Sequence, residues 1–344
     1  MNRRQVIASF VSCAVALAAV GASGPRAASA QANVVNVYSA RHYGALEKVF
    51  AEFERETGIR VRLSSGSSQA LLERLRAEGK ATPADLFFVI DAGTLQLAAE
   101  EGLLQPVDSQ VLRTVIPPEL RDPQNRWFAL TQRVRTIVYN SNRVKPSELS
   151  TYEALADRKW RGRLCMRPAT HIYTISLVAG MIANLGERRT EQVVRGWVAN
   201  RPTFIDSDSR IIENITAGKC DVAIINHYYV GNALSKDANL PVKVFWANQN
   251  AQGAHVNISG AGVTANALNR ENAIKLLEWL ATRGQDPSVA GLAGGNNEFP
   301  VNPSAQPTEI IKGFGPFKAD LAALSRYGPL QAQAIKLLER AGYK

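Results

Sequence analysis

The residues in this sequence best suited to unusual chemistry are tyrosines that follow predicted β-strands. Tyr228 and Tyr229 come shortly after the apolar run 222–225, which is short, continuous and rich in β-branched residues, as a strand buried on both faces would be. Tyr43 follows the first predicted strand, and Tyr173 follows the strand-like segment 163–166. Because ligands bind outside the carboxyl ends of strands in open α/β sheets, we expect these phenols to face a ligand. The alternative is that the rings only pack between two lobes.

A cluster of phenols favours a particular kind of metal. A phenol has a pKa near 10, so it becomes a phenolate at neutral pH only when something strongly favours the anion. A hard, highly charged cation such as Fe(III) does this, because metal binding selects the deprotonated ligand. Thiolate-rich or imidazole-rich sets would favour softer metals, and all-carboxylate sets would favour Ca or Mg. His42 and His227 lie in two of the same loops, and no C-x-x-C occurs. Phenol oxygens with one imidazole suit ferric iron.

Strands and helices alternate along the chain, which predicts an α/β fold containing parallel strands. A helix is predicted just before the run 222–225, because the apolar residues there have helical spacing and Gly218 would end the helix. The end of the chain, 315–343, is predicted to be helical. The first third is predicted to contain strands at 34–38, 59–63 and 85–90 and helices at 45–57 and 69–78.

Two long strand-like segments, 129–140 and 255–263, are predicted to cross between two lobes. The first alternates apolar and polar residues and carries Arg133 and Arg135. The predicted architecture is a two-lobed α/β fold in which two mixed-sheet lobes are joined by crossing strands. The N-terminal lobe is predicted to comprise 31–131 and 260–305, and the C-terminal lobe 132–259 and 306–344.

The first thirty residues have the pattern of a secretory signal. Arg3 and Arg4 precede an apolar stretch over 6–20, and an A-x-A ending predicts cleavage after Ala30. The arginine pair fits both twin-arginine export and an ordinary signal. The apolar stretch is too short for a membrane span, and no later segment is predicted to enter a bilayer. We therefore expect a soluble periplasmic protein.

The net charge limits the classes of binding partner, and the cysteines bear on disulfide formation. The formal net charge is +10, and a signal carrying three arginines and no acidic residue would leave +7. The basic residues are dispersed, which argues against nucleic-acid binding and suits an anion, an acidic partner or a negatively charged envelope. Outside the signal, only Cys165 and Cys220 remain. Their apolar surroundings predict buried free thiols, although an oxidising compartment permits a bridge.

Four motifs together resemble one family, the periplasmic ferric-ion-binding proteins of ABC iron importers, especially the branch found in cyanobacteria and Campylobacter. The resemblance extends over essentially the whole chain after the signal. The motifs are Tyr38-Ser39-Ala40-Arg41-His42-Tyr43, the segments 150–157 and 159–163, Tyr228-Tyr229-Val230-Gly231, and the segment 253–260.

This resemblance implies a type II periplasmic binding protein fold that closes on Fe(3+). It implies that His42 and Tyr43 from one lobe, with Tyr173, Tyr228 and Tyr229 from the other, hold the metal. Some members of the family leave the histidine uncoordinated or add a synergistic anion such as carbonate. We expect Arg41, Arg133 or Arg135 to hold such an anion or to offset the phenolate charge. The implied partners are the permease and ATPase of an ABC iron importer, and the protein is expected to be a monomer.

Two other functions fit parts of the sequence. The same fold would serve as a receptor for an anion or small organic molecule, with arginines as ligands and tyrosines as stacking walls. A periplasmic enzyme is the second alternative, but no G-x-S-x-G or H-E-x-x-H motif occurs.

Several residues near the motifs could instead have structural roles such as packing or helix capping. His227 is expected to pack or cap, and His171 and His255 to be ordinary polar residues. Tyr38 and Tyr139 either bond to the site or pack in the core. The Ser-rich turn 64–68 either cradles an anion or caps a helix.

Overall fold

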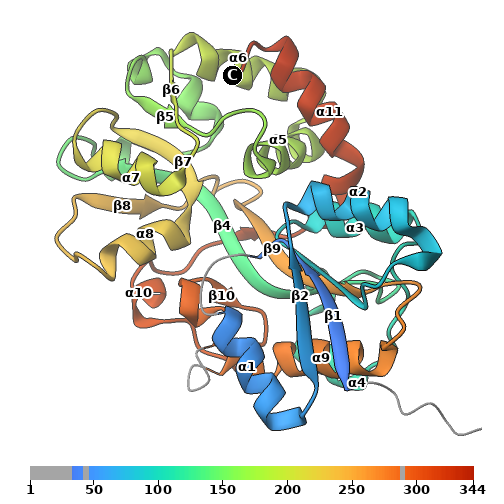
Figure 1. Ribbon diagram of the computed structural model, residues 1–344. Helices are drawn as coiled ribbons and strands as arrows, with labels where there is room; N and C mark the ends of the chain where they lie inside the picture. The colour runs from blue at the N-terminus through green and yellow to red at the C-terminus, as the bar shows by residue number, and fades with distance from the viewer. Residues whose placement is uncertain (1–32, 42–45, 287–290) are drawn as a thin grey trace, which may run out of the picture. The chain divides into compact units, whose positions relative to one another are not determined.

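The computed structural model describes residues 33–41, 46–286 and 291–344 (Figure 1). The alternation predicted for the first third of the chain is confirmed. Side chains fix two of its helix starts, because Ser67 and Asp91 accept hydrogen bonds from the backbone of the first turns that follow them. The elements are β1 (Val34–Ser39), α1 (Leu46–Thr57), β2 (Arg60–Ser65), α2 (Ser68–Glu78), β3 (Leu86–Val89), α3 (Ala92–Glu100) and α4 (Gln110–Val115).

The two predicted crossing strands are β4 (Phe128–Asn140) and β9 (Ala254–Val263), which pair antiparallel. The chain between them forms β5 (Leu164–Met166), α5 (Ile172–Leu185), α6 (Glu187–Ala199), β6 (Thr203–Phe204), α7 (Asp208–Thr216), β7 (Val222–Asn226), α8 (His227–Leu234) and β8 (Val242–Phe245). The chain after them forms α9 (Arg270–Ala281), β10 (Phe299–Pro300), α10 (Glu309–Lys312), β11 (Ala319–Asp320) and α11 (Tyr327–Arg340).

The strand pairing runs through both crossing strands without interruption. The order is β2-β1-β3-β9-β4-β7-β5-β6, with β8 and β10 also paired to β4 and β11 to β9. The group β1–β3 is parallel, as is the group β5–β7, while β4 and β9 run antiparallel to their neighbours in both groups. Figure 1 shows β4 and β9 between the two groups. The mixed α/β architecture predicted from the sequence is confirmed.

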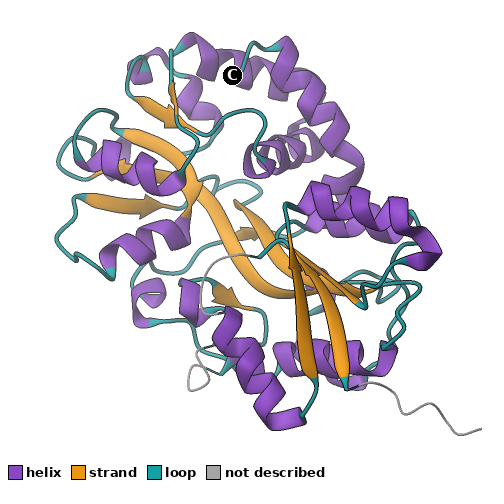
Figure 2. Ribbon diagram, in the orientation of Figure 1, coloured by secondary structure: helices purple, strands orange, loops and turns teal. Residues whose placement is uncertain are grey.

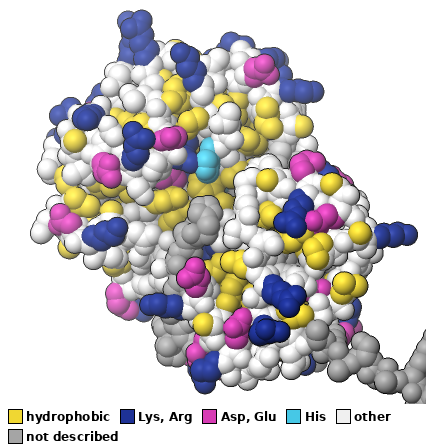
Figure 3. All heavy atoms as spheres, viewed as in Figure 1, with side chains coloured by type: hydrophobic (Ala, Val, Ile, Leu, Met, Phe, Trp, Pro, Cys, Tyr) yellow, Lys and Arg dark blue, Asp and Glu magenta, His cyan; other side chains and the backbone are white. Residues whose placement is uncertain are grey.

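Buried side chains form three apolar clusters around this sheet. One surrounds β1–β3 and most of β9, a second lies among β5, α5, α6 and α11, and a third lies among α7, β7 and α8. Helices pack outside the strands (Figure 2). On the face shown in Figure 3, basic and acidic side chains are interspersed, in line with the dispersed charge of the sequence. No helix among the described residues is long and apolar enough to cross a membrane.

Three local predictions were wrong. Cys165 and Cys220 are not free thiols but form a disulfide with their Cα atoms 5.8 Å apart, because β5 lies beside β7 in the sheet. The C-terminal stretch is helical mainly over α11, and residues 319–320 form strand β11 instead. Tyr228 and Tyr229 do not lie on a loop, since helix α8 begins directly after β7.

Candidate metal centre

Three of the predicted tyrosines lie at the starts of two neighbouring helices. β5 and β7 are adjacent parallel strands, so their carboxyl ends lie at the same edge of the sheet. Helix α5 begins after β5 and carries Tyr173 at its second position. Helix α8 begins directly after β7 and carries Tyr228 and Tyr229 in its first turn. The strand-end argument made from the sequence therefore explains why these phenols meet.

The three phenols are in contact or nearly so. The hydroxyl oxygens of Tyr173 and Tyr228 lie 3.2 Å apart, within hydrogen-bond distance. The rings of Tyr228 and Tyr229 have their centroids 4.3 Å apart. Tyr173 and Tyr228 are buried, whereas Tyr229 is partly exposed. The structure thus places three oxygen donors together from two helices.

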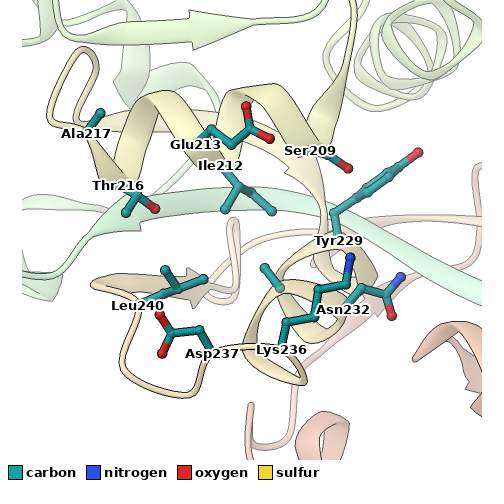
Figure 4. Close-up of a pocket in the computed structure, with 11 residues that line it drawn as sticks. Ser209, Ile212, Glu213, Thr216, Ala217, Tyr229, Asn232, Lys236, Asp237 and Leu240 are labelled. Atoms are coloured by element: carbon teal, nitrogen blue, oxygen red, sulfur yellow. The ribbon is translucent and has the colours of Figure 1, made fainter.

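Tyr229 also borders a surface pocket of about 470 Å³ between α7 and α8. Ile212 and Leu240 supply apolar walls, and Lys236 and Asp237 lie among its charged residues. Figure 4 shows the Tyr229 ring at the border of this pocket, with its hydroxyl directed away from Leu240 and Asp237. The hydroxyl therefore does not point towards these two residues of the pocket wall.

Burial keeps Tyr173 protonated in the absence of a cation. Its pKa is raised to about 12, chiefly by desolvation and next by the neighbouring Tyr229, while Arg133 and the hydrogen bond with Tyr228 act to lower it. A phenolate at this position therefore needs a positive ion close to the oxygen. A hard trivalent cation meets that requirement, because it binds the deprotonated ligand.

Both arginines of the crossing strand lie over the same tyrosine ring. The guanidinium carbons of Arg133 and Arg135 are 5.1 and 5.6 Å from the centroid of the Tyr173 ring. The alternation along β4 predicted a basic face, but both side chains are buried, 1% and 3% exposed. Arg133 donates to the carbonyl of Ile90. Both predicted arginines, rather than one of them, therefore lie beside the phenols.

Sequence reasoning missed a carboxylate that pairs with these cations. Asp208 opens helix α7 and is buried, with its oxygens 3.3 Å from Arg135 Nη1 and 3.7 Å from Arg167 Nε. Arg135 Nη1 also lies 3.4 Å from the side-chain oxygen of Asn226. Arg167 follows β5 and Asn226 ends β7. The same strand-end rule that found the tyrosines could have found both.

Two of the predicted ligands, His42 and Tyr43, lie outside the described residues. Arg41, just before them, is buried and forms an ion pair of 2.6 Å with Glu298. It also donates to Thr131 and Ser259, one on each crossing strand. These contacts fix Arg41, the last described residue before the two predicted ligands.

The other histidines and tyrosines have structural roles. His171 caps α5 by accepting from the backbone nitrogen of Tyr173, and His227 accepts from Val134, which confirms that His227 packs or caps. His255 lies 3.0 Å from the hydroxyl of Tyr327. Ser67 caps α2, which supports the capping interpretation of the Ser-rich turn. Tyr38 and Tyr139 are buried in the apolar clusters.

Conventional metal ligands do not gather elsewhere in the described part of the chain. Within residues 33–41, 46–286 and 291–344, no group of three or more His, Cys, Asp or Glu side chains is arranged to hold a metal ion. The phenol cluster is therefore the candidate centre that the described side chains offer. In this mixed α/β fold, the tyrosines lie after the ends of parallel strands and beside β4 and β9, the antiparallel strands that join the two groups of the sheet. This is the architecture of a solute-binding protein.

Comparisons with known proteins agree with this architecture. Residues 35–286 match the family model described as bacterial extracellular solute-binding protein. "Iron uptake protein A1" of Synechocystis is 40% identical over 317 residues, covering 90% of this chain and 87% of that protein. The chain therefore belongs to the bacterial extracellular solute-binding proteins and, within them, to the ferric-ion-binding branch, as the resemblance predicted.

Solved structures support the same assignment. A structure of Trichodesmium IdiA (FutA) in complex with iron and citrate ligands is similar at 41% identity and a TM-score of 0.82, covering 90% of this chain and all of that one. The ferric binding protein from Campylobacter jejuni is similar at 33% identity and a TM-score of 0.84, with the same coverage. These likenesses confirm the predicted type II periplasmic binding protein fold.

Proposed function

We propose that this protein is a periplasmic receptor that binds ferric iron through tyrosine phenolates and delivers it to an ABC importer. The observation that carries the proposal is the meeting of Tyr173, Tyr228 and Tyr229 at two helix starts, next to Arg133 and Arg135. Relatives named for iron uptake and ferric binding support iron as the cargo. They also confirm the prediction of a binding protein rather than an enzyme.

Charge explains why phenols and arginines occur together. Three phenolates balance a tripositive ion, and a fourth from Tyr43 would leave an excess of negative charge. Buried charge is costly unless it is paired, so cations near the phenolates stabilise the loaded site. Arg133 and Arg135 are close enough to Tyr173 to do this. They would serve equally to hold a synergistic anion such as carbonate.

The remaining ligands and the motion follow from the predicted lobes. His42 and Tyr43 are proposed to complete the site from the lobe made of 31–131 and 260–305. The other lobe, made of 132–259 and 306–344, supplies the three tyrosines. Closure is proposed to be a hinge motion about β4 and β9, the strands that both groups of the sheet share. Arg41 supports this coupling, since it bonds to both crossing strands immediately before His42.

Export and assembly are inferred from the sequence and the family. Solute-binding proteins of iron uptake systems work with ABC transporters, and we propose a dedicated permease and ATPase as partners. Residues 1–30 are proposed to be the export signal, with the twin-arginine route as one way across the membrane. A monomer suffices for the proposed function, because the described tyrosines come from one chain.

A receptor for an anion is the second candidate. Two buried arginines, Arg135 and Arg167, share a single carboxylate, Asp208, among the ion pairs of the described residues. An excess of buried positive charge favours an anionic ligand. In this function the tyrosines would stack on the ligand instead of binding a metal.

A visible absorption titration separates the two candidates. The mature protein is titrated with chelated ferric iron, beside a Tyr228→Phe/Tyr229→Phe variant. Phenolate bound to Fe(III) should give a saturable charge-transfer band at one iron per chain, bleached by a reducing agent and lost in the double variant. Tyr139→Phe, at a buried phenol of the core on β4, is the matched control and should keep the band. A wild-type protein without a band would overturn iron binding through phenolates, and thermal stabilisation by anions alone would then favour the second candidate.

A further inference from the structure

One edge of the crossing strand β4 is covered by two different strands with a gap between them. β7 pairs with Arg135–Tyr139, and β10 pairs with residues 131 and 132. β9 pairs with Phe128–Arg135, so it occupies the opposite edge along this stretch. β7 and β10 must therefore share one edge. Residues 133 and 134 of β4 lie between the end of one and the start of the other.

The side chain of His227 fills this gap. The last pair between β4 and β7 joins Arg135 to Asn226, so the next step of the same register would set Val134 opposite His227. There the main chain has already turned into α8, and the backbone nitrogen of Val134 donates instead to His227 Nδ1 at 3.0 Å. An imidazole nitrogen takes the place that a strand carbonyl would have had.

A second contact fixes the ring on the other side of the gap. The imidazole stacks on Phe299, the first residue of β10, with centroids 4.8 Å apart and planes inclined by 26°. His227 is fully buried. Its ring therefore contacts both β4 and β10, and His227 itself directly follows β7 in the chain.

We propose that His227 is a positioning residue for the tyrosine site. By accepting the hydrogen bond of Val134, it lets the chain leave the sheet at once and begin α8, so that Tyr228 and Tyr229 are held in its first turn. Val134 lies between Arg133 and Arg135, so the same bond fixes the tyrosine helix against the strand that carries both arginines. This inference rests on the proposed function, because its consequence is the geometry of the iron-binding phenols.

Two substitutions separate the hydrogen bond from the packing. His227→Phe keeps an aromatic ring against Phe299 but removes the acceptor, whereas His227→Asn offers an oxygen close to the place of Nδ1. We expect His227→Phe to bind ferric iron about 10–100-fold more weakly, as is typical when a group that orients a metal ligand is removed, and to shift its charge-transfer band. His227→Asn should restore both properties towards the wild type. Affinity is measured by competition with citrate.

A matched control tests whether loss of any buried imidazole has the same effect. His255 is also buried, and its Nδ1 lies near the Tyr327 hydroxyl rather than near α8. His255→Phe should lower the unfolding temperature while keeping the wild-type band. A folded His227→Phe variant with wild-type affinity and band would overturn the inference, as would a His227→Asn variant as impaired as His227→Phe.

A measurement on the unaltered protein covers the case in which His227→Phe does not fold. In nitrogen-15-labelled wild-type protein, the amide of Val134 should show a scalar coupling across the hydrogen bond to His227 Nδ1. Absence of that coupling would overturn the inference. The proposed function is tested separately, because it requires the wild-type protein to show the charge-transfer band. A wild-type protein without the band overturns both the proposed function and the role of His227. A wild-type band that His227→Phe keeps unchanged overturns only the role of His227.

Discussion

The buried carboxylates of Asp91 and Asp208 have different kinds of partner: neutral hydrogen-bond donors at Asp91 and arginine cations at Asp208. Asp91 precedes α3 and accepts five hydrogen bonds, all from neutral groups. They come from the backbone and hydroxyl of Thr94 and from the side chains of Ser176, Asn257 and Gln331, which lie on α3, α5, β9 and α11. Both carboxylate oxygens are used. One side chain thus joins four elements from distant parts of the sequence.

Asp208 has cations as partners and lies among groups that are not fully bonded. Arg135 and Arg167 lie 3.3 and 3.7 Å away. Among the described residues, Nε of each arginine and the amide nitrogen of Asn226 have no hydrogen-bond partner. Buried polar groups are normally satisfied, and exceptions call for an explanation. Both oxygens of Asp91 are hydrogen-bonded, and this network holds the fold together. Near Asp208, beside Tyr173, some buried polar atoms of the described side chains have no hydrogen-bond partner and could bind a ligand.

The largest effect that tests this contrast is expected at Asp91. Asp91→Ala should lower the free energy of unfolding by on the order of 3–5 kcal/mol, because several buried donors lose their acceptor and each unsatisfied group costs about 1–3 kcal/mol. Urea denaturation measures the loss. Asp91→Asn, which keeps one acceptor oxygen, should lose less and still give the charge-transfer band with iron. Wild-type stability in Asp91→Ala would mean that the network does not hold the fold.

Acid should lower the stability of both regions, and each buried imidazole should contribute less per pH unit than the loss of the Asp91 carboxylate costs. Burial, the largest cause in each case, lowers the pKa of His171, His227 and His255 to about 3. In the unfolded chain a histidine pKa is about 6.5, so between these values the unfolded state binds more protons. The stability that each neutral imidazole confers is complete above about pH 6.5 and is lost as the pH falls towards 3, by at most about 1.4 kcal/mol per pH unit.

Denaturant unfolding between about pH 7 and about pH 4 checks this slope. His255 lies on β9, the strand that also supplies Asn257 to Asp91, whereas His171 and His227 belong to the starts of the tyrosine-bearing helices. Replacing His255 by Asn should remove the contribution of that histidine to the change in unfolding free energy per pH unit. The contributions of His171 and His227 should remain. A stability that is flat across this range would show that the three imidazoles are not held neutral by burial.

The sequence predicted those parts of the site that depend on local pattern. The β-branched run before Tyr228 predicts a buried strand whatever surrounds it, and the strand-end rule then locates Tyr173, Tyr228 and Tyr229 together. It could not show that Arg133 and Arg135 are both buried. The alternation along β4 separates two faces, but α5, which covers the arginine face, is distant in the sequence.

The missed features depend on pairing between distant segments. Arg167 and Asp208 follow β5 and β6, which have three and two residues and are too short to give a periodic signal. Cys165 and Cys220 are 55 residues apart, and only the pairing of β5 with β7 brings them together. The role of His227 likewise needs the register of β4, which composition does not reveal.

The smallest predicted effect concerns the charge around Tyr173. Asp208 is among the groups that raise the pKa of Tyr173, and Arg133 acts against it. Asp208→Asn keeps the size of the side chain but removes its charge, so the pKa of Tyr173 should fall. Ultraviolet absorbance of tyrosinate in the metal-free protein measures this change as the pH is raised, with Tyr173→Phe identifying the contribution of that ring.

Asp206→Asn is the matched control for this measurement. Asp206 lies two residues away, is 77% exposed and pairs with Arg210 at the surface, where solvent screens its charge. Its replacement should leave the Tyr173 pKa unchanged. If Asp208→Asn also leaves it unchanged, the carboxylate does not control the charge at the phenols, and the two buried carboxylates differ only in their partners. If the pKa falls in Asp208→Asn alone, Asp208 opposes deprotonation in the empty site, so the phenolates form only when a cation arrives.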